Sequence, residues 1–244
     1  MPNLSQLIAG AFLLGLCGQV ALGAASITEP ETLVYRGEIT FEDNATAFEL
    51  YRRSVIKPTR IEITSLGGGI NAGLQLGEWI VANQLAVRVP RYCVSACANY
   101  IFVAGKTKYL GATAYLVWHG GAYQPGLADI LKANANREIV RRLSVTDQAT
   151  ARAQKYQEID GYMEFIQHRE TAYFDALNID PRITTLGQIE PYVSRFPQGI
   201  AFSGWDYSIE DMAKMGVLNV FIEGEQWVPS AASRGVRIHR LTLE

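Results

Sequence analysis

Three short segments of the chain hold residue types that could carry out acyl transfer. Ser95 lies between the end of a predicted strand and a short buried helix that we expect to stop at Gly105. Upstream, three consecutive glycines at residues 67–69 connect a predicted strand to a helix. Downstream, an apolar strand ends in His119, which two glycines follow. A serine at a helix start, a glycine loop with exposed N–H groups and a histidine at a strand end together make up an acyl-transfer site.

Each segment also has an ordinary structural interpretation. Serine is a common N-cap, whose oxygen accepts an orphan backbone N–H, and Ser95 taken alone favours that interpretation. Three glycines can form a plain flexible turn, or a loop whose backbone approaches a ligand closely. A lone histidine is most often structural or solvated. The three segments together shift the balance toward Ser95 as a nucleophile at the positive end of a helix dipole.

The elements expected around these segments bring them to one edge of a sheet. Alternating and apolar patterns predict strands at residues 32–40, 60–64, 85–89 and 115–118, a turn at 41–44, and helices at 45–55 and 71–84. Successive β-α-β steps imply parallel strands with right-handed crossovers. Parallel sheets place ligands beyond the carboxyl ends of their strands, and all three segments follow strand ends.

The second half of the chain is predicted to be mostly helical. We expect helices at residues 127–143, 146–177, 186–196 and 209–215, a strand at 217–222 and an edge strand at 236–243. Gly161 is a point where the long helix could break, and Pro191 interrupts the third helix. An apolar stripe on the long helix indicates core or a subunit interface; it consists of Tyr156, Ile159, Met163, Ile166, Tyr173 and Leu177.

Composition indicates one globular domain that follows an export signal. A chain of 244 residues with 48% hydrophobic and 19% charged residues can bury a full core, and its net charge of −2 argues against nucleic acid as a partner. Residues 1–25 carry no charge and contain an apolar run followed by small residues. We predict a signal peptide at residues 1–25, with cleavage near Ala24 or Ala25, and a single domain at residues 26–244. The alternative is an uncleaved anchor in the inner membrane, the one membrane contact expected, instead of a periplasmic or secreted protein.

Two cysteines flank the serine. In an oxidising compartment Cys93 and Cys97 could form a disulfide that pins the turn carrying Ser95, or they could be two small buried thiols. The remaining histidines, His168 and His239, lie far along the chain. We therefore predict no metal and no cofactor.

The same segments resemble a known family. Residues 63–73, Ile-Thr-Ser-Leu-Gly-Gly-Gly-Ile-Asn-Ala-Gly, resemble the glycine loop of the Clp protease proteolytic subunit, and Ser-Ala-Cys-Ala at residues 95–98 resembles its nucleophile segment. The order of parts and the spacing from Ser95 to His119 are also similar. The Cys-x-Ser-Ala-Cys pattern resembles that of predicted periplasmic Clp-protease-like proteins. The resemblance covers residues 32–122, with a weaker similarity at 208–220, and implies an α/β, Clp/crotonase-like superhelix of β-β-α units with a helical excursion after the histidine strand.

This resemblance implies an exported serine peptidase or hydrolase. Ser95 would attack a carbonyl of a peptide or protein substrate, His119 would act as base, and the N–H groups of Gly68 and Ala96 would hold the oxyanion. The nearest acid to the family position is Asp206, although its spacing to the following helix differs from the family pattern. Weaker candidates for this acid are Asp160 and Asp175, and Lys155 is a candidate for a Ser–Lys dyad. The family often forms homo-oligomers.

Three rival classes remain open at this point. A non-catalytic binding protein on the same fold would keep the loop and pocket but lose the orienting acid, which the doubtful Asp206 fits. A crotonase-like acyl-CoA enzyme would use backbone N–H groups to hold an enolate, but CoA chemistry is cytoplasmic. A cysteine nucleophile at Cys93 or Cys97 is the third alternative.

Overall fold

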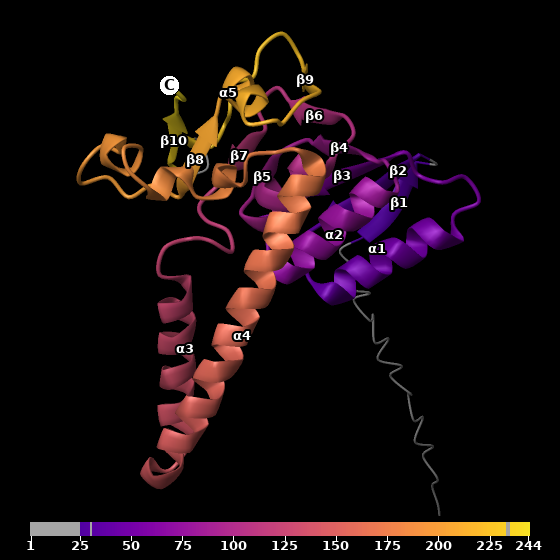
Figure 1. Ribbon diagram of the computed structural model, residues 1–244. Helices are drawn as coiled ribbons and strands as arrows, with labels where there is room; N and C mark the ends of the chain where they lie inside the picture. Colours follow the sequence, from indigo (N-terminus) through magenta and orange to yellow (C-terminus); the bar gives the residue numbers. More distant parts are fainter. Residues whose placement is uncertain (1–24, 30, 233–234) are drawn as a thin grey trace, which may run out of the picture.

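The computed structural model describes residues 25–29, 31–232 and 235–244, and its centre is a mostly parallel sheet (Figure 1). The strands follow the order β1-β2-β3-β4-β6-β9. All neighbours pair in parallel except β1, which is antiparallel to β2. The bounds are β1 (Ala25–Glu29), β2 (Thr32–Arg36), β3 (Arg60–Thr64), β4 (Ala86–Val89), β6 (Lys108–Gly111) and β9 (Val220–Glu223). The predicted α/β class is therefore confirmed.

Four further strands form a second ribbon beside this sheet. They are β5 (Tyr92–Val94), β7 (Tyr115–Val117), β8 (Gly204–Tyr207) and β10 (Ile238–Leu241). β5 pairs in parallel with β7, and β8 in parallel with β10. Single bridges join Ser65 to Cys93 and Trp118 to Trp205, so the ribbon continues from the end of β3 across to β10. The three candidate segments lie next to one another along this ribbon.

Two groups of helices surround the strands. Those next to the sheet are α1 (Phe41–Arg53), α2 (Ile70–Ala82), α5 (Ile209–Lys214) and a short helix of π type at Cys97–Phe102, called the serine helix below. The other two, α3 (Leu127–Arg142) and α4 (Val145–Leu177), form a hairpin that projects away from the sheet (Figure 1). The C-terminal part of α4 returns to the body and packs against α2.

The core has a large part around the sheet and a small part in the hairpin. Residues such as Leu33, Ile61 and Val87 are fully buried in the sheet core. Where the hairpin meets the body, Ile159, Met163 and Ile166 of the predicted stripe pack around Ala122 in a separate cluster. The long helix thus buries its apolar stripe, as predicted, and is not broken at Gly161.

Several predicted boundaries were wrong for identifiable reasons. Residues 41–44 form the first turn of α1 instead of a separate turn, because the Thr40 hydroxyl caps the helix by accepting the Asp43 N–H at 3.1 Å. Residues 186–196 form short 3₁₀ turns and not one helix, since Pro191 supplies no N–H. The strand β8 was not predicted, and the edge strand at the C-terminus is its partner β10.

The N-terminal prediction falls almost entirely outside the described residues. Of the predicted signal peptide at residues 1–25, only Ala25 is described; it pairs with Tyr35 at the start of β1. Within the described part of the chain, no helix is both long and apolar enough to cross a membrane.

Candidate active site

Ser95 occupies a sharp turn between β5 and the serine helix. Its backbone is left-handed, with φ of +58°, a conformation that costs a serine about 1–3 kcal/mol. The turn is held by two backbone hydrogen bonds of 2.8 Å, from the Ser95 N–H to the Val117 carbonyl and from the Asn99 N–H to the Ser95 carbonyl. The half-buried Ser95 hydroxyl has no hydrogen-bond partner among the described residues, and it does not cap the helix.

The glycine loop touches this turn directly. Gly67 has φ of +102°, and a Cβ at this position would lie 2.7 Å from the Ser95 Cβ and 3.1 Å from the Ala96 nitrogen. The Gly67 N–H donates to the Ser65 hydroxyl at 3.0 Å. By contrast, the N–H groups of Gly68 and Ala96 have no acceptor within the described part of the chain. Two free backbone donors therefore lie on segments that meet at Ser95.

His119 follows β7, the strand that pairs with β5. Val94 of β5 pairs with Val117 of β7, so the next register position sets Ser95 beside Trp118, one residue before His119. The His119 imidazole is exposed and makes no hydrogen bond to a described residue, while its carbonyl accepts from Gln188 at 3.0 Å. His119 thus lies one residue past the position paired with Ser95, and no hydrogen bond joins the two side chains; catalytic hydrogen bonds are often long or absent in unliganded sites.

The predicted third residue, Asp206, has a different partner. Its two carboxylate oxygens accept from Arg240, at 2.5 Å from Nε and 2.7 Å from Nη2. Burial raises the pKa of Asp206 above its ordinary value, and the bonds from Arg240 oppose that shift. Beside His119 the strand β8 carries Gly204, where a Cβ would lie 3.1 Å from the His119 Cβ. No contact in the described residues supports Asp206 as the group that orients His119.

The other acids predicted for that role lie elsewhere. Asp160 forms an ion pair with Lys132 at 2.5 Å inside the hairpin. Asp175 is exposed on α4. Neither contacts His119 in the described structure.

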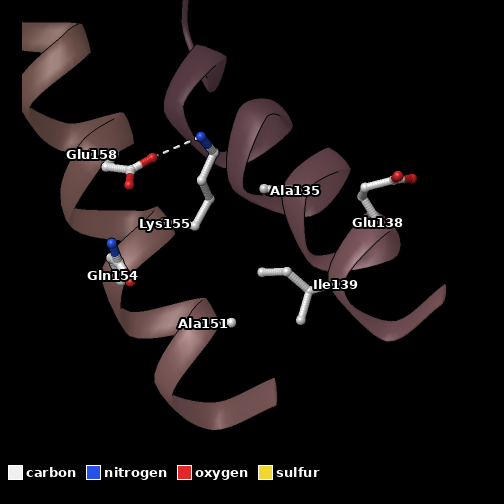
Figure 2. Close-up of a pocket in the computed structure, with 7 residues that line it drawn as sticks. All are labelled: Ala135, Glu138, Ile139, Ala151, Gln154, Lys155 and Glu158. Atoms are coloured by element: carbon white, nitrogen blue, oxygen red, sulfur yellow. Dashed lines mark hydrogen bonds and ion pairs between the residues drawn. The ribbon is translucent and has the colours of Figure 1, made fainter. Parts of the chain in front are cut away.

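Lys155, the alternative base, belongs to the projecting hairpin. It lies 2.7 Å from Glu158, and both line a cavity of about 380 Å³ between α3 and α4 (Figure 2). Ala135, Ile139 and Ala151 supply the apolar part of that cavity. Because the hairpin projects away from the sheet, this cavity is remote from Ser95 and gives the Ser–Lys alternative no support (Figure 1).

A disulfide spans the serine. Cys93 and Cys97 are bonded, with their Cα atoms 5.1 Å apart, and both are fully buried. A sulfur in a disulfide is not a free thiolate, so in this state neither cysteine is a nucleophile. The bond fastens the middle residue of β5 to the first residue of the serine helix across the left-handed turn.

A cavity of about 340 Å³ opens beside the glycine loop. It lies at the carboxyl ends of β2 and β3, where a parallel arrangement is expected to bind ligands, beside the first residue of β5. Leu66, 66% exposed, and Tyr92 give it apolar walls. Its lining also includes Gly37, Glu38, Thr64, Ser65, Gly67 and Gly68. The space could take the chain of a substrate next to the Gly68 N–H, whereas Ser95, Ala96 and His119 are not among the residues that line it.

The sequence analysis missed Glu170, a buried acid of α4. Its carboxylate accepts from the Tyr100 hydroxyl at 2.5 Å and from the Ala122 N–H at 3.1 Å. Burial raises the pKa of Glu170, opposed by hydrogen bonds from Tyr100 and from the backbone of Ala122 and Tyr123. One signal was present in the sequence: Glu170 falls between Ile166 and Tyr173 on the apolar stripe, where a charge is unexpected.

No known protein-family model matches this chain, and no curated protein matches it in sequence. The described residues also contain no group of three or more His, Cys, Asp or Glu side chains placed to hold a metal ion. The function is therefore inferred from the geometry around Ser95.

Proposed function

We propose that the protein is a serine hydrolase that cleaves acyl bonds, such as those of peptides or esters. The observation that carries this proposal is the unbonded Ser95 hydroxyl on a left-handed strand-to-helix turn. Two free N–H groups, those of Gly68 and Ala96, lie on the segments that meet there. An ordinary N-cap serine would bond its own helix and would adopt an extended backbone. A nucleophile, by contrast, is often presented on a strained turn of this kind.

The chemistry follows the order of these groups. As the Ser95 oxygen attacks the substrate carbonyl carbon, His119 takes the hydroxyl proton. The C–O π electrons move onto the oxygen, which the N–H groups of Gly68 and Ala96 hold; each such donor supplies on the order of 3 kcal/mol. The C=O bond then re-forms, the bond to the leaving group breaks, and the leaving group takes the proton from His119. In the second half, His119 takes a proton from water as the water oxygen attacks the acyl carbon; the ester bond to Ser95 breaks and the Ser95 oxygen takes the proton back from His119.

His119 works without an orienting acid in this proposal. Gly204 lies beside it, and Asp206 is committed to Arg240. Loss of the orienting acid lowers turnover by about 10⁴-fold in enzymes with a full triad, so we expect a slow enzyme. The same observation favours the second candidate, a binding protein that uses the loop and cavity without catalysis.

We further propose that the fold is Clp/crotonase-like and that the protein is exported. The second strand ribbon and the helical hairpin after the histidine strand support the first proposal. The Cys93–Cys97 disulfide supports the second, because such bonds persist in oxidising compartments such as the periplasm.

Hydrolysis of an activated ester and of a set of fluorogenic peptides tests the function. Ser95→Ala and His119→Ala are each expected to lower the rate strongly, to no more than the residual rate that binding and the oxyanion donors support. The matched controls are Ser194→Ala and His168→Ala, which replace an exposed serine and an exposed histidine elsewhere. Unchanged hydrolysis by Ser95→Ala would contradict the proposal. Absence of turnover together with saturable binding of a peptide would favour the binding protein.

A further inference from the structure

We propose that Glu170 is a positioning residue that holds the serine helix and the histidine loop in their working arrangement. This inference rests on the proposed function. The histidine loop is defined as residues 119–123. Glu170 lies on α4, outside both segments, and its side chain is fully buried.

One carboxylate joins the two segments. The Tyr100 hydroxyl, five residues after Ser95, donates to Glu170 Oε1 at 2.5 Å. The Ala122 N–H, three residues after His119, lies 3.1 Å from the same oxygen and 3.2 Å from the other. Moving either segment relative to α4 would therefore break a hydrogen bond to a buried charge.

Neighbouring contacts strengthen this connection. Tyr173, three residues along α4, donates from its hydroxyl to the Tyr100 carbonyl at 2.5 Å. Asn99 of the serine helix donates to the Gly120 carbonyl at 2.6 Å, a direct bond between the two segments. Glu170 thus acts within a network of hydrogen bonds in which each fixes the geometry of the next.

The backbone is shaped to admit the carboxylate. A Cβ on Gly121 would lie 2.6 Å from Glu170 Oε1 and 2.7 Å from the Thr184 hydroxyl. Glycine at this position lets the histidine loop close over the carboxylate. An apolar side chain in place of Glu170 would not require the main chain of the histidine loop to approach it so closely.

The partners of Glu170 are hydrogen-bond donors and not cations. Within the described part of the chain, no Lys or Arg forms an ion pair with Glu170; the Tyr100 hydroxyl and the Ala122 N–H donate to it instead. Replacing Glu170 by an apolar residue would leave both donors buried without an acceptor, which costs stability. The positioning role is therefore tested by reactivity and local exchange, and not by stability alone.

The test compares Glu170→Gln, Glu170→Leu and Tyr100→Phe with the wild type. A fluorophosphonate probe gives KI and kinact for labelling, and hydrogen–deuterium exchange follows the amides of residues 119–123. Tyr35→Phe is the matched control, since it removes another buried tyrosine hydrogen bond, to Asn44, outside both segments. A small displacement of reacting groups can cost about 10²-fold in rate.

We expect Glu170→Leu to lower kinact by 10- to 100-fold, with KI within about twofold, and to lower the melting temperature because two buried donors lose their acceptor. Glu170→Gln keeps an acceptor oxygen for the Ala122 N–H, so its kinact should lie between that of the wild type and that of Glu170→Leu. Both should speed amide exchange in residues 119–123. Tyr35→Phe should lower the melting temperature and leave kinact unchanged.

Wild-type kinact and wild-type exchange in both folded Glu170 variants would overturn the proposal. If Glu170→Leu does not fold, Tyr100→Phe decides by the same two measurements. If the wild type itself is not labelled, the proposed function fails. The exchange rates of residues 119–123 in the Glu170 variants then test the positioning role of Glu170 by themselves. Faster exchange than in the wild type supports that role, and unchanged exchange overturns it.

Discussion

Ser95 is distinguished from other serines by its backbone. Its φ of +58° is held by hydrogen bonds to Val117 and Asn99, and its hydroxyl is left without a partner in the described structure. The sequence identified the residue and its place at a helix start. It could not show the left-handed turn, because that conformation is imposed by strands that are distant in sequence.

Gly67 is the residue whose size matters most to this turn. In Gly67→Ala the new methyl would lie 2.7 Å from the Ser95 Cβ, at a φ that L-residues avoid. We expect the free energy of unfolding to fall by about 2 kcal/mol or more and labelling by a fluorophosphonate to be lost.

Gly69 provides the matched control for this substitution. Nothing lies within 4 Å of a Cβ on Gly69, and its φ of −64° suits any residue. Gly69→Ala should cost less than about 1 kcal/mol and keep labelling. Equal effects of the two substitutions, measured by denaturant unfolding and probe labelling, would refute the close packing of Gly67 on Ser95.

Among the elements, the serine turn depends on its disulfide. Cys93→Ala combined with Cys97→Ala opens a five-residue loop, which costs about 2 kcal/mol of unfolding free energy in the chain-entropy treatment. We expect slower labelling of Ser95 in that variant. A reductant should slow labelling of the wild type and leave the variant unaffected. Labelling of the double variant at the wild-type rate would show that the bridge does not hold the turn.

Periodicity predicted some strands and missed others, among them β6, whose buried residues alternate, and β8. The strand β3, with its alternating pattern, was predicted with the observed bounds. All four residues of β8 are buried, and they include a glycine and Asp206, so no alternation marks it as a strand. Asp206 is tolerated there because Arg240 arrives from β10, a partner that local patterns do not reveal.

At the scale of the whole molecule, strand pairing brings the site together. The rule that parallel strands present ligands at their carboxyl ends placed the glycine loop, Ser95 and His119 on one edge before any contact was known. The features that the sequence did not predict depend on contacts between residues far apart in the chain. Glu170 reaches the site from a helix about 50 residues past His119, and Gly204, not an acid, lies beside that histidine.

The buried amine of Lys108 makes the stability of the whole fold depend on pH. Burial lowers the pKa of Lys108 from 10.5 to about 8, and the amine donates to the carbonyls of Gly105 and Leu218. Between pH 8 and 10 the unfolded chain binds more protons at this residue than the folded protein does. The free energy of unfolding should therefore rise with pH across that window.

Denaturant unfolding at several pH values checks this dependence. Lys108→Met should flatten the rise between pH 8 and 10. Lys106→Met, which removes an exposed neighbouring amine, should keep it. A wild-type slope in Lys108→Met would show that another group is responsible.

Mapping the adduct of a fluorophosphonate probe tests the central claim most directly. The purified protein, with its disulfide intact, is treated with the probe, digested and analysed by mass spectrometry. We predict one modified residue, Ser95, and loss of the adduct in His119→Ala but not in His168→Ala. An unmodified folded protein, or an adduct on any other residue, would contradict the assignment of Ser95 as an activated nucleophile.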